Sequence, residues 1–217
     1  MLPHEALQSQ VQVERSLLSR VLGWLTGSLA LTVVGVYLSG QLASTIHPLL
    51  FLLVAFGLIF AIQASVAARN QVLAGGLFAV FSVVEGLFIG PIIYTYLQYA
   101  PDAVGNALVG TVGIFLAASA VVYLTSINMA AWGRYLLGAL IVGIVLIFAN
   151  LVFHAGISSL VLDLFLGAVF IGLTLFDFWR VKAQRAGDNN ALMLALSLYL
   201  DFINLFLILL RVFGRRN

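Results

Sequence analysis

Long stretches without a charged side chain most strongly constrain what this chain can fold into. No Asp, Glu, Lys or Arg occurs in four stretches: Val21 to Ala68, Gly86 to Pro101, Ala103 to Gly133 and Tyr135 to Leu162. A helix needs about 20 apolar residues to cross a bilayer. Over the whole chain, 63% of the residues are hydrophobic and only 8% are charged, which is far more apolar than a soluble domain. The sequence therefore predicts an all-α integral membrane protein.

Polar residues and turn formers divide these stretches into seven helices. A polar cluster around His47 and Pro48 interrupts the first stretch, and Arg69 to Gln71 forms a tight turn. Continuing along the chain in this way predicts helices over 21–43, 48–68, 72–97, 104–125, 135–153, 158–181 and 191–213. We expect a single transmembrane domain over residues 21–213, with a retained polar tail over 1–20 and a short basic tail over 214–217.

Basic residues predict the orientation of the helices. They precede the first helix and follow the second, fourth and sixth, so the positive-inside rule places these ends and the N-terminus in the cytoplasm. Arg211, Arg215 and Arg216 would then lie outside if the last helix crosses completely. A re-entrant last segment, the alternative, would place all ten basic residues inside. The net charge of +2 is explained by this topology and indicates no nucleic-acid partner.

Four acidic residues fall inside the predicted helices: Glu85, Asp163, Asp177 and Asp201. A charge near the bilayer centre costs about 2.5 to 3.5 kcal/mol or more, so each is a functional candidate. Asp163 lies near the outer end of its helix, where a negative charge suits the helix dipole. Glu85 is about 20 Å along its helix, in mid-membrane. Two hypotheses stand for Glu85: a protonated carboxyl that is hydrogen-bonded within the bundle, and a part of an ion path.

Asp177 and Asp201 lie on consecutive helices, on either side of one cytoplasmic turn. Their spacing from the centre of that turn places both carboxyls in the inner half of the bilayer at similar depth. Facing carboxyls in a dry site share a proton and titrate as a coupled pair. The spacing therefore favours a proton-dependent latch. The alternative is that Arg180 or Arg69 neutralises the pair, which would then only hold helices together.

Three segments resemble the Bax inhibitor-1 family. ALSLYLDFINLFLILLRVFG (195–214) resembles the last helix of that family, and this motif is quite specific. VVEGLFIGPIIY (83–94) resembles its glycine-rich third helix, and LTLFDFWRVK (173–182) its sixth. Together with the seven helices and the chain length, the resemblance covers nearly the whole chain.

The resemblance implies a bundle of seven transmembrane helices with the C-terminal helix central, in a bacterial plasma (inner) membrane. It also implies a pH-sensitive calcium leak in which Asp177 and Asp201 are sensor and gate, closed when the pair is protonated or bridged. Arg69 would be the gate lock. Calcium is the permeant ion and would bind only transiently near the pair; no cofactor is expected. The lipid bilayer and calcium ions are the expected partners.

The chain departs from the family pattern in two places. The end of the second helix has a single Arg, Arg69, where relatives often have several basic residues. Glu85 occupies a position that is commonly uncharged. Gly86, Gly90 and Pro91 belong to the family pattern, and the two glycines form a face on which helices can approach closely. Close packing is the favoured interpretation, and a gating hinge is the alternative.

Enzymatic functions are disfavoured by the motifs. Intramembrane aspartyl proteases also carry two aspartates on adjacent helices, but Leu198, Tyr199 and Leu200 stand before Asp201 where Gly-x-Gly is required, and the Pro-Ala-Leu motif is missing. The three histidines are isolated, without a HExxH pattern for zinc. We therefore expect no enzyme activity.

Two other functions compete with the leak channel. The first is an interaction protein that modulates a membrane-bound quality-control protease through the tail over residues 1–20. The second is a proton-coupled cation transporter, since a protonatable pair serves exchange as readily as gating.

Overall fold

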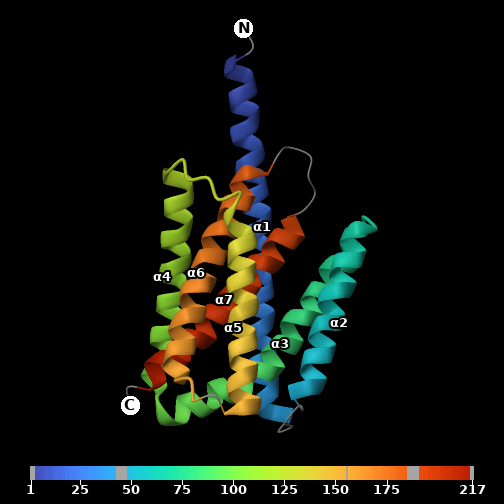
Figure 1. Cartoon of the computed structure of the whole chain (residues 1–217). Coiled ribbons are helices and arrows are strands. Elements are labelled where there is room, and N and C mark those ends of the chain that lie inside the picture. Colours follow the sequence, from blue (N-terminus) through green and yellow to red (C-terminus); the bar gives the residue numbers. More distant parts are fainter. Residues whose placement is uncertain (1–2, 43–47, 155, 185–190, 216–217) are drawn as a thin grey trace. The chain divides into compact units, whose positions relative to one another are not determined.

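The computed structural model describes residues 3–42, 48–154, 156–184 and 191–215 of the 217-residue chain. Within these ranges the chain forms helices joined by short turns (Figure 1). The helices are α1 (Pro3–Leu42), α2 (Pro48–Ala67), α3 (Gln71–Tyr99), α4 (Pro101–Leu124), α5 (Trp132–Phe153), α6 (Ser159–Ala183) and α7 (Ala191–Gly214). All seven are long and apolar enough to cross a membrane, which confirms the predicted fold class. The predicted ends agree to within a few residues, except at the beginning of α1.

α1 begins at Pro3 rather than near residue 21, and it contains 40 residues. Proline is well tolerated in the first turn of a helix, and the Gln, Glu, Ala and Leu residues that follow have good helix propensity. The segment predicted as a polar tail therefore continues the helix. Its apolar part starts only at Leu17. A helix of this length measures about 60 Å, roughly twice the hydrocarbon thickness of a bilayer.

The chain divides into two compact units. Unit 1 comprises Met1–Tyr99 and Gln184–Tyr199, and unit 2 comprises Ala100–Ala183 and Leu200–Asn217. The division falls inside α7, whose first part belongs to unit 1 and whose second part belongs to unit 2. α7 is the most buried helix, with 61% of its apolar window buried against 6% to 39% in the other six. The central position that the resemblance implies for the last helix stays a prediction.

In unit 1, α1 and α3 pack closely because glycines face each other. A Cβ atom on Gly86 would lie 2.9 Å from the Cα of Gly35, and one on Gly90 would collide with the Ser39 side chain. Gly86 and Gly90 thus form a close-packing face, as predicted from their spacing. Pro91 lies inside α3 but on its exposed side, outside this face.

The α2–α3 turn is stabilised mainly by hydrogen bonds of its own backbone. Arg69 adopts the left-handed conformation, with φ of 58°. Its backbone N–H donates to the Val66 carbonyl, and that of Asn70 donates to the Ser65 carbonyl, both at 2.9 Å. The Asn70 side chain then accepts a hydrogen bond from the Leu73 N–H at 3.1 Å, which caps the start of α3. The turn fixes α2 and α3 as an antiparallel hairpin.

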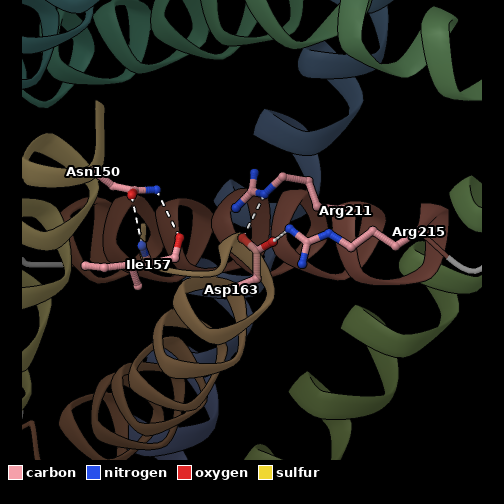
Figure 2. Close-up of polar contacts among 5 residues, drawn as sticks. All are labelled: Asn150, Ile157, Asp163, Arg211 and Arg215. Carbon is pink, nitrogen blue, oxygen red and sulfur yellow. Dashed lines mark hydrogen bonds and ion pairs between the residues drawn. The ribbon is translucent and has the colours of Figure 1, made fainter. Parts of the chain in front are cut away.

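In unit 2, polar side chains form hydrogen bonds with backbone groups at the helix ends. Asn150 of α5 makes two hydrogen bonds of 3.1 Å to the backbone of Ile157, across the turn into α6 (Figure 2). Lys182 of α6 donates to the carbonyls of Val122 and Thr125 at 2.7 and 2.9 Å. These carbonyls belong to the last turn of α4, where helical partners are missing. Lys182 therefore caps α4 from a neighbouring helix.

Candidate functional site

Asp177 of α6 and Asp201 of α7 both belong to unit 2, and both are buried. On α6, Thr174, Asp177 and Val181 share one buried face, as expected for residues three and four apart. On α7, most residues around Asp201 are buried too. The charge of Asp177 acts on the Asp201 carboxyl, and so does that of Arg180. The structure therefore brings together the two aspartates that the sequence singles out.

Arg180 is an ion-pair partner of Asp177. Its Nη1 atom lies 2.9 Å from Asp177 Oδ1, one helical turn away on α6. The Arg180 side chain is 39% exposed, whereas that of Asp177 is 8% exposed. The Asp177 end of this ion pair is therefore buried, whereas the Arg180 end is partly exposed. Arg180 thus forms with Asp177 the neutralising ion pair that the sequence analysis gave as an alternative.

Asp201 has a different environment. Its Oδ2 atom is buried and has no hydrogen-bond partner within the described ranges. Leaving a buried polar atom unsatisfied costs about 1 to 3 kcal/mol, and more when it is charged. Thr174 lies within hydrogen-bonding reach of Asp201, but its hydroxyl donates to the Phe170 carbonyl at 2.8 Å.

Phe115 of α4 packs against the residue that follows each aspartate. Its ring makes edge-on contacts with Phe178, which follows Asp177, and with Phe202, which follows Asp201. The ring centroids are 5.8 and 5.2 Å apart, a favourable range for aromatic pairs. Phe115 thereby fixes α6 and α7 at matched positions. Sequence reasoning missed it, because an aromatic residue in an apolar helix carries no local signal.

Asp163 forms a second charged cluster in unit 2, with Arg211 of α7 and Arg215, which follows α7 (Figure 2). Arg211 Nε lies 2.9 Å from Asp163 Oδ1, and Arg215 Nη2 lies 2.6 Å from Asp163 Oδ2. The Asp163 side chain is only 7% exposed, so the two arginines satisfy a buried carboxylate. Asp163 is therefore more than a charge at a helix end. The signal in the sequence that could have suggested these partners is the group of arginines at the end of the last helix.

Glu85 and Arg69 both belong to unit 1. Glu85 is half-buried in the middle of α3, beside the Gly86 contact with α1, and its charge acts on Tyr199 of α7. Arg69 is exposed in the α2–α3 turn. Because Asp177 and Asp201 lie in the other unit, the Arg69 lock stays a prediction.

No metal centre is built from the usual ligands in the described part of the chain. No three His, Cys, Asp or Glu side chains gather there closely enough to hold an ion. Among the described residues, Asp177 and Asp201 are the carboxyls that this site could offer to calcium.

Comparison with known proteins identifies the family to which the chain belongs. Residues 14–217 match the family model described as inhibitor of apoptosis-promoting Bax1. The chain is 36% identical over 221 residues to the inner membrane protein YbhL of Escherichia coli K12, covering 92% of each chain. It is 28% identical to a protein of Deinococcus radiodurans, covering 97% of this chain and 95% of the other. A membrane protein of Streptococcus pyogenes serotype M1 is 35% identical over 162 residues, covering 72% of this chain and 69% of the other.

The match extends over all seven membrane helices, including the α3, α6 and α7 segments that carry the resemblance. The chain is an integral membrane protein and belongs to the Bax inhibitor-1 family.

Proposed function

We propose that this protein is a pH-sensitive, calcium-permeable leak channel, and not an enzyme, with Asp177 and Asp201 as its sensor and gate. The observation that carries the proposal is the unequal environment of the two buried carboxyls. Asp177 already has the Arg180 guanidinium at 2.9 Å, whereas Asp201 keeps a buried oxygen that has no hydrogen-bond partner among the described residues. A proton on Asp201 can bridge to Asp177 and hold α6 and α7 together.

Loss of that proton would open the gate by electrostatic repulsion. Two negative charges and one positive charge would then share a buried site. Two unit charges about 4 Å apart repel by about 4 kcal/mol at an effective dielectric constant near 20. A free-energy difference of this size shifts a two-state equilibrium by about a thousandfold. Arg180 would offset part of this repulsion, and the remainder would favour separation of the two helices.

The membrane placement belongs to the same proposal. The N-terminus and the turns after α2, α4 and α6 would face the cytoplasm, since they carry basic residues. The name of the Escherichia coli relative supports the inner membrane of a bacterium as the location. Arg69, in the α2–α3 turn, would lie on the cytoplasmic side and lock the closed form by pairing with Asp177.

Calcium flux into liposomes tests the channel. Purified protein would be reconstituted, and flux would be followed from about pH 5 to pH 8 beside the variants Asp177→Asn and Asp201→Asn. Asp102→Asn is the matched control, because Asp102 is exposed in the first turn of α4. We expect flux to rise with pH in the wild type and in the control. In the two gate variants its pH dependence should shift or vanish, because one titrating carboxyl is gone.

Flux equal to that of empty liposomes at every pH would end the channel proposal. Saturable flux that requires an opposing proton gradient would instead identify a proton-coupled cation transporter.

A second candidate function, a modulator of a membrane protease, is favoured by the length of α1. The helix begins at Pro3, whereas its apolar part begins at Leu17. These 14 or so residues extend the helix by about 21 Å and could contact a partner. Deletion of residues 1–16 separates the two functions. A leak channel would keep its calcium flux, whereas a modulator would lose co-purification with the protease.

A further inference from the structure

The two arginines that bind Asp163 keep hydrogen-bond donors that the cluster does not use. Arg211 donates from Nε to Asp163 Oδ1 at 2.9 Å, and Arg215 donates from Nη2 to Asp163 Oδ2 at 2.6 Å. A guanidinium has five N–H donors. Within the described ranges, neither arginine makes another hydrogen bond or ion pair. Most donors of each guanidinium therefore remain available to a ligand.

The available donors lie at the surface of unit 2. The Asp163 side chain is only 7% exposed, whereas those of Arg211 and Arg215 are 42% and 32% exposed. Figure 2 shows both guanidinium groups directed toward the one carboxylate. Because the buried Asp163 holds one side of each guanidinium, the exposed atoms of both arginines are kept in fixed positions. The cluster is thus organised before any ligand binds.

The cluster carries one positive charge in excess, because two arginines meet one aspartate. Outside the proposed gate, the other acidic residue of unit 2 is Asp102. Asp102 is exposed, and it forms no ion pair in the part of the chain that the structure describes. The excess charge and the available donors both fit a ligand with a single negative charge.

The cluster lies at the depth of the lipid headgroups. Asp163 is one turn after Ser159, the first residue of α6, and Arg215 follows Gly214, the last residue of α7. α6 contains 25 residues, so it measures about 37 Å, whereas the hydrocarbon core of a bilayer is about 30 Å thick. The ends of the helix therefore reach the headgroup region, where lipid phosphates lie.

An apolar strip of α6 begins next to the cluster. Val161, Leu164 and Ile171 are exposed, and their spacing places them on one face of the helix. Leu164 directly follows Asp163, so the strip leads from the cluster into the hydrocarbon region. A lipid bound by its phosphate would lay an acyl chain along this strip. A soluble phosphate ester would gain nothing from it, so the strip favours a lipid.

We propose that Arg211 and Arg215 form a binding site for the phosphodiester of an anionic phospholipid, with Asp163 as the positioning residue. The planar fork of a guanidinium binds phosphate oxygens through paired N–H donors. Phosphatidylglycerol carries one net negative charge, which matches the excess charge of the cluster, whereas phosphatidylcholine is zwitterionic. The site does not depend on whether Asp177 and Asp201 form a gate.

Native mass spectrometry of the full chain, released from detergent after addition of either lipid, tests the site. We expect the first phosphatidylglycerol to bind about tenfold more tightly than phosphatidylcholine. Arg211→Gln and Arg215→Gln should each remove most of this difference, because each loses hydrogen bonds between charged groups. Arg134→Gln is the matched control and should keep the difference, since Arg134 is exposed and contacts its neighbour Tyr135.

A second measurement needs no substitution and therefore does not depend on whether the variants fold. Phenylglyoxal modifies accessible arginines, and mass spectrometry of peptides quantifies the modification at each one. The wild-type chain would be labelled in nanodiscs of phosphatidylcholine, with or without phosphatidylglycerol. We expect phosphatidylglycerol to protect Arg211 and Arg215 several-fold, and to protect Arg134 less.

Three outcomes would overturn the proposal. Equal affinity for the two lipids, or equal protection of Arg134, Arg211 and Arg215, would show that the cluster only stabilises unit 2. Loss of the lipid preference in Arg134→Gln would show that overall charge alone attracts the lipid. Glycerol phosphate, which has no acyl chain, is the competitor. Displacement of phosphatidylglycerol by an equal concentration of it would assign the site to a soluble phosphate ester.

Discussion

Arg180 Nη1 lies 2.9 Å from Asp177 Oδ1, one turn away on the same helix. The partner of Asp177 is thus supplied by α6 itself, and it does not depend on how other helices are placed. Asp201, on α7, has no basic neighbour one turn away, since the residues at these positions are Ser197, Leu198, Asn204 and Leu205. The two carboxyls of the pair are therefore inequivalent, and in the proposed gate the bridging proton would belong to Asp201.

Arg180→Gln should move calcium flux toward higher pH. Removal of the guanidinium takes away a positive charge that favours ionised carboxyls, so the protonated, closed form persists to a higher pH. The exposure of Arg180 limits the effect, because solvent screens its charge. Liposome flux between about pH 5 and pH 8 measures the shift. Arg134→Gln, an exposed position that contacts only its neighbour Tyr135 among the described side chains, is the matched control. An unchanged profile in Arg180→Gln would contradict the unequal pair.

Phe115→Leu should weaken the closed state of the proposed gate. The ring contacts Phe178 and Phe202, each next to one of the aspartates. Aromatic pairs contribute about 0.5 to 1.5 kcal/mol each beyond area burial, so α6 and α7 should separate more easily. We expect several-fold higher calcium flux at acidic pH. Phe148→Leu on the exposed face of α5 is the control. Equal flux in both variants would show that Phe115 only fills space.

Asp163→Asn should lower the stability of unit 2. The buried carboxylate accepts from Arg211 and Arg215, and hydrogen bonds to charged groups contribute about 1.5 to 3 kcal/mol when desolvated. The arginines are 42% and 32% exposed, so the lower end of this range is expected. Thermal unfolding in detergent, followed by loss of the monodisperse protein, measures the change.

A double-mutant cycle separates the ion pairs from other effects. Arg211→Gln and Asp163→Asn together should destabilise by less than the sum of the single changes, because they remove the same interaction. Additive losses would show that Asp163 and Arg211 do not stabilise each other.

Gly86→Ala should destabilise the α1–α3 contact. The added Cβ would lie 2.9 Å from the Gly35 Cα, which is backbone and cannot rotate away. Overpacking of this kind costs about 1 to 3 kcal/mol. Gly76→Ala on the same helix is the matched control, since nothing lies within 4 Å of its added Cβ. Alanine favours a helix over glycine by up to about 1 kcal/mol, so the control should be neutral or more stable. Thermal unfolding of both variants in detergent measures the difference in stability.

The helix boundaries could be predicted well because they depend on local properties. Charge-free stretches and polar turns are visible in the sequence, and α2 to α7 begin and end close to the predicted residues. The beginning of α1 was predicted wrongly, at about residue 21 rather than Pro3. Polarity marks where an apolar segment ends, but it does not end a helix whose residues have good helix propensity.

Partners across helices could not be predicted in the same way. The pairing of Asp163 with Arg211 and Arg215, and that of Thr32 with Tyr199, joins residues that are far apart in the sequence. Each depends on which faces of two helices meet, and a helix in lipid has no polar face to reveal this. Asp177 and Asp201 are the exception, because their helices are consecutive in the sequence and their spacing from the segment between them predicts a similar depth.

The sequence by itself determined that seven helices cross a membrane and that four carboxyls lie within them. Hydrophobicity and the energetic cost of a buried charge are properties of single residues and short segments. Only the tertiary structure decided the surroundings of three of these carboxyls: Arg180 for Asp177, two arginines for Asp163, and an oxygen without a hydrogen-bond partner among the described residues for Asp201. Packing brings these groups together, because side chains on different helices interact only when their faces are brought within contact distance.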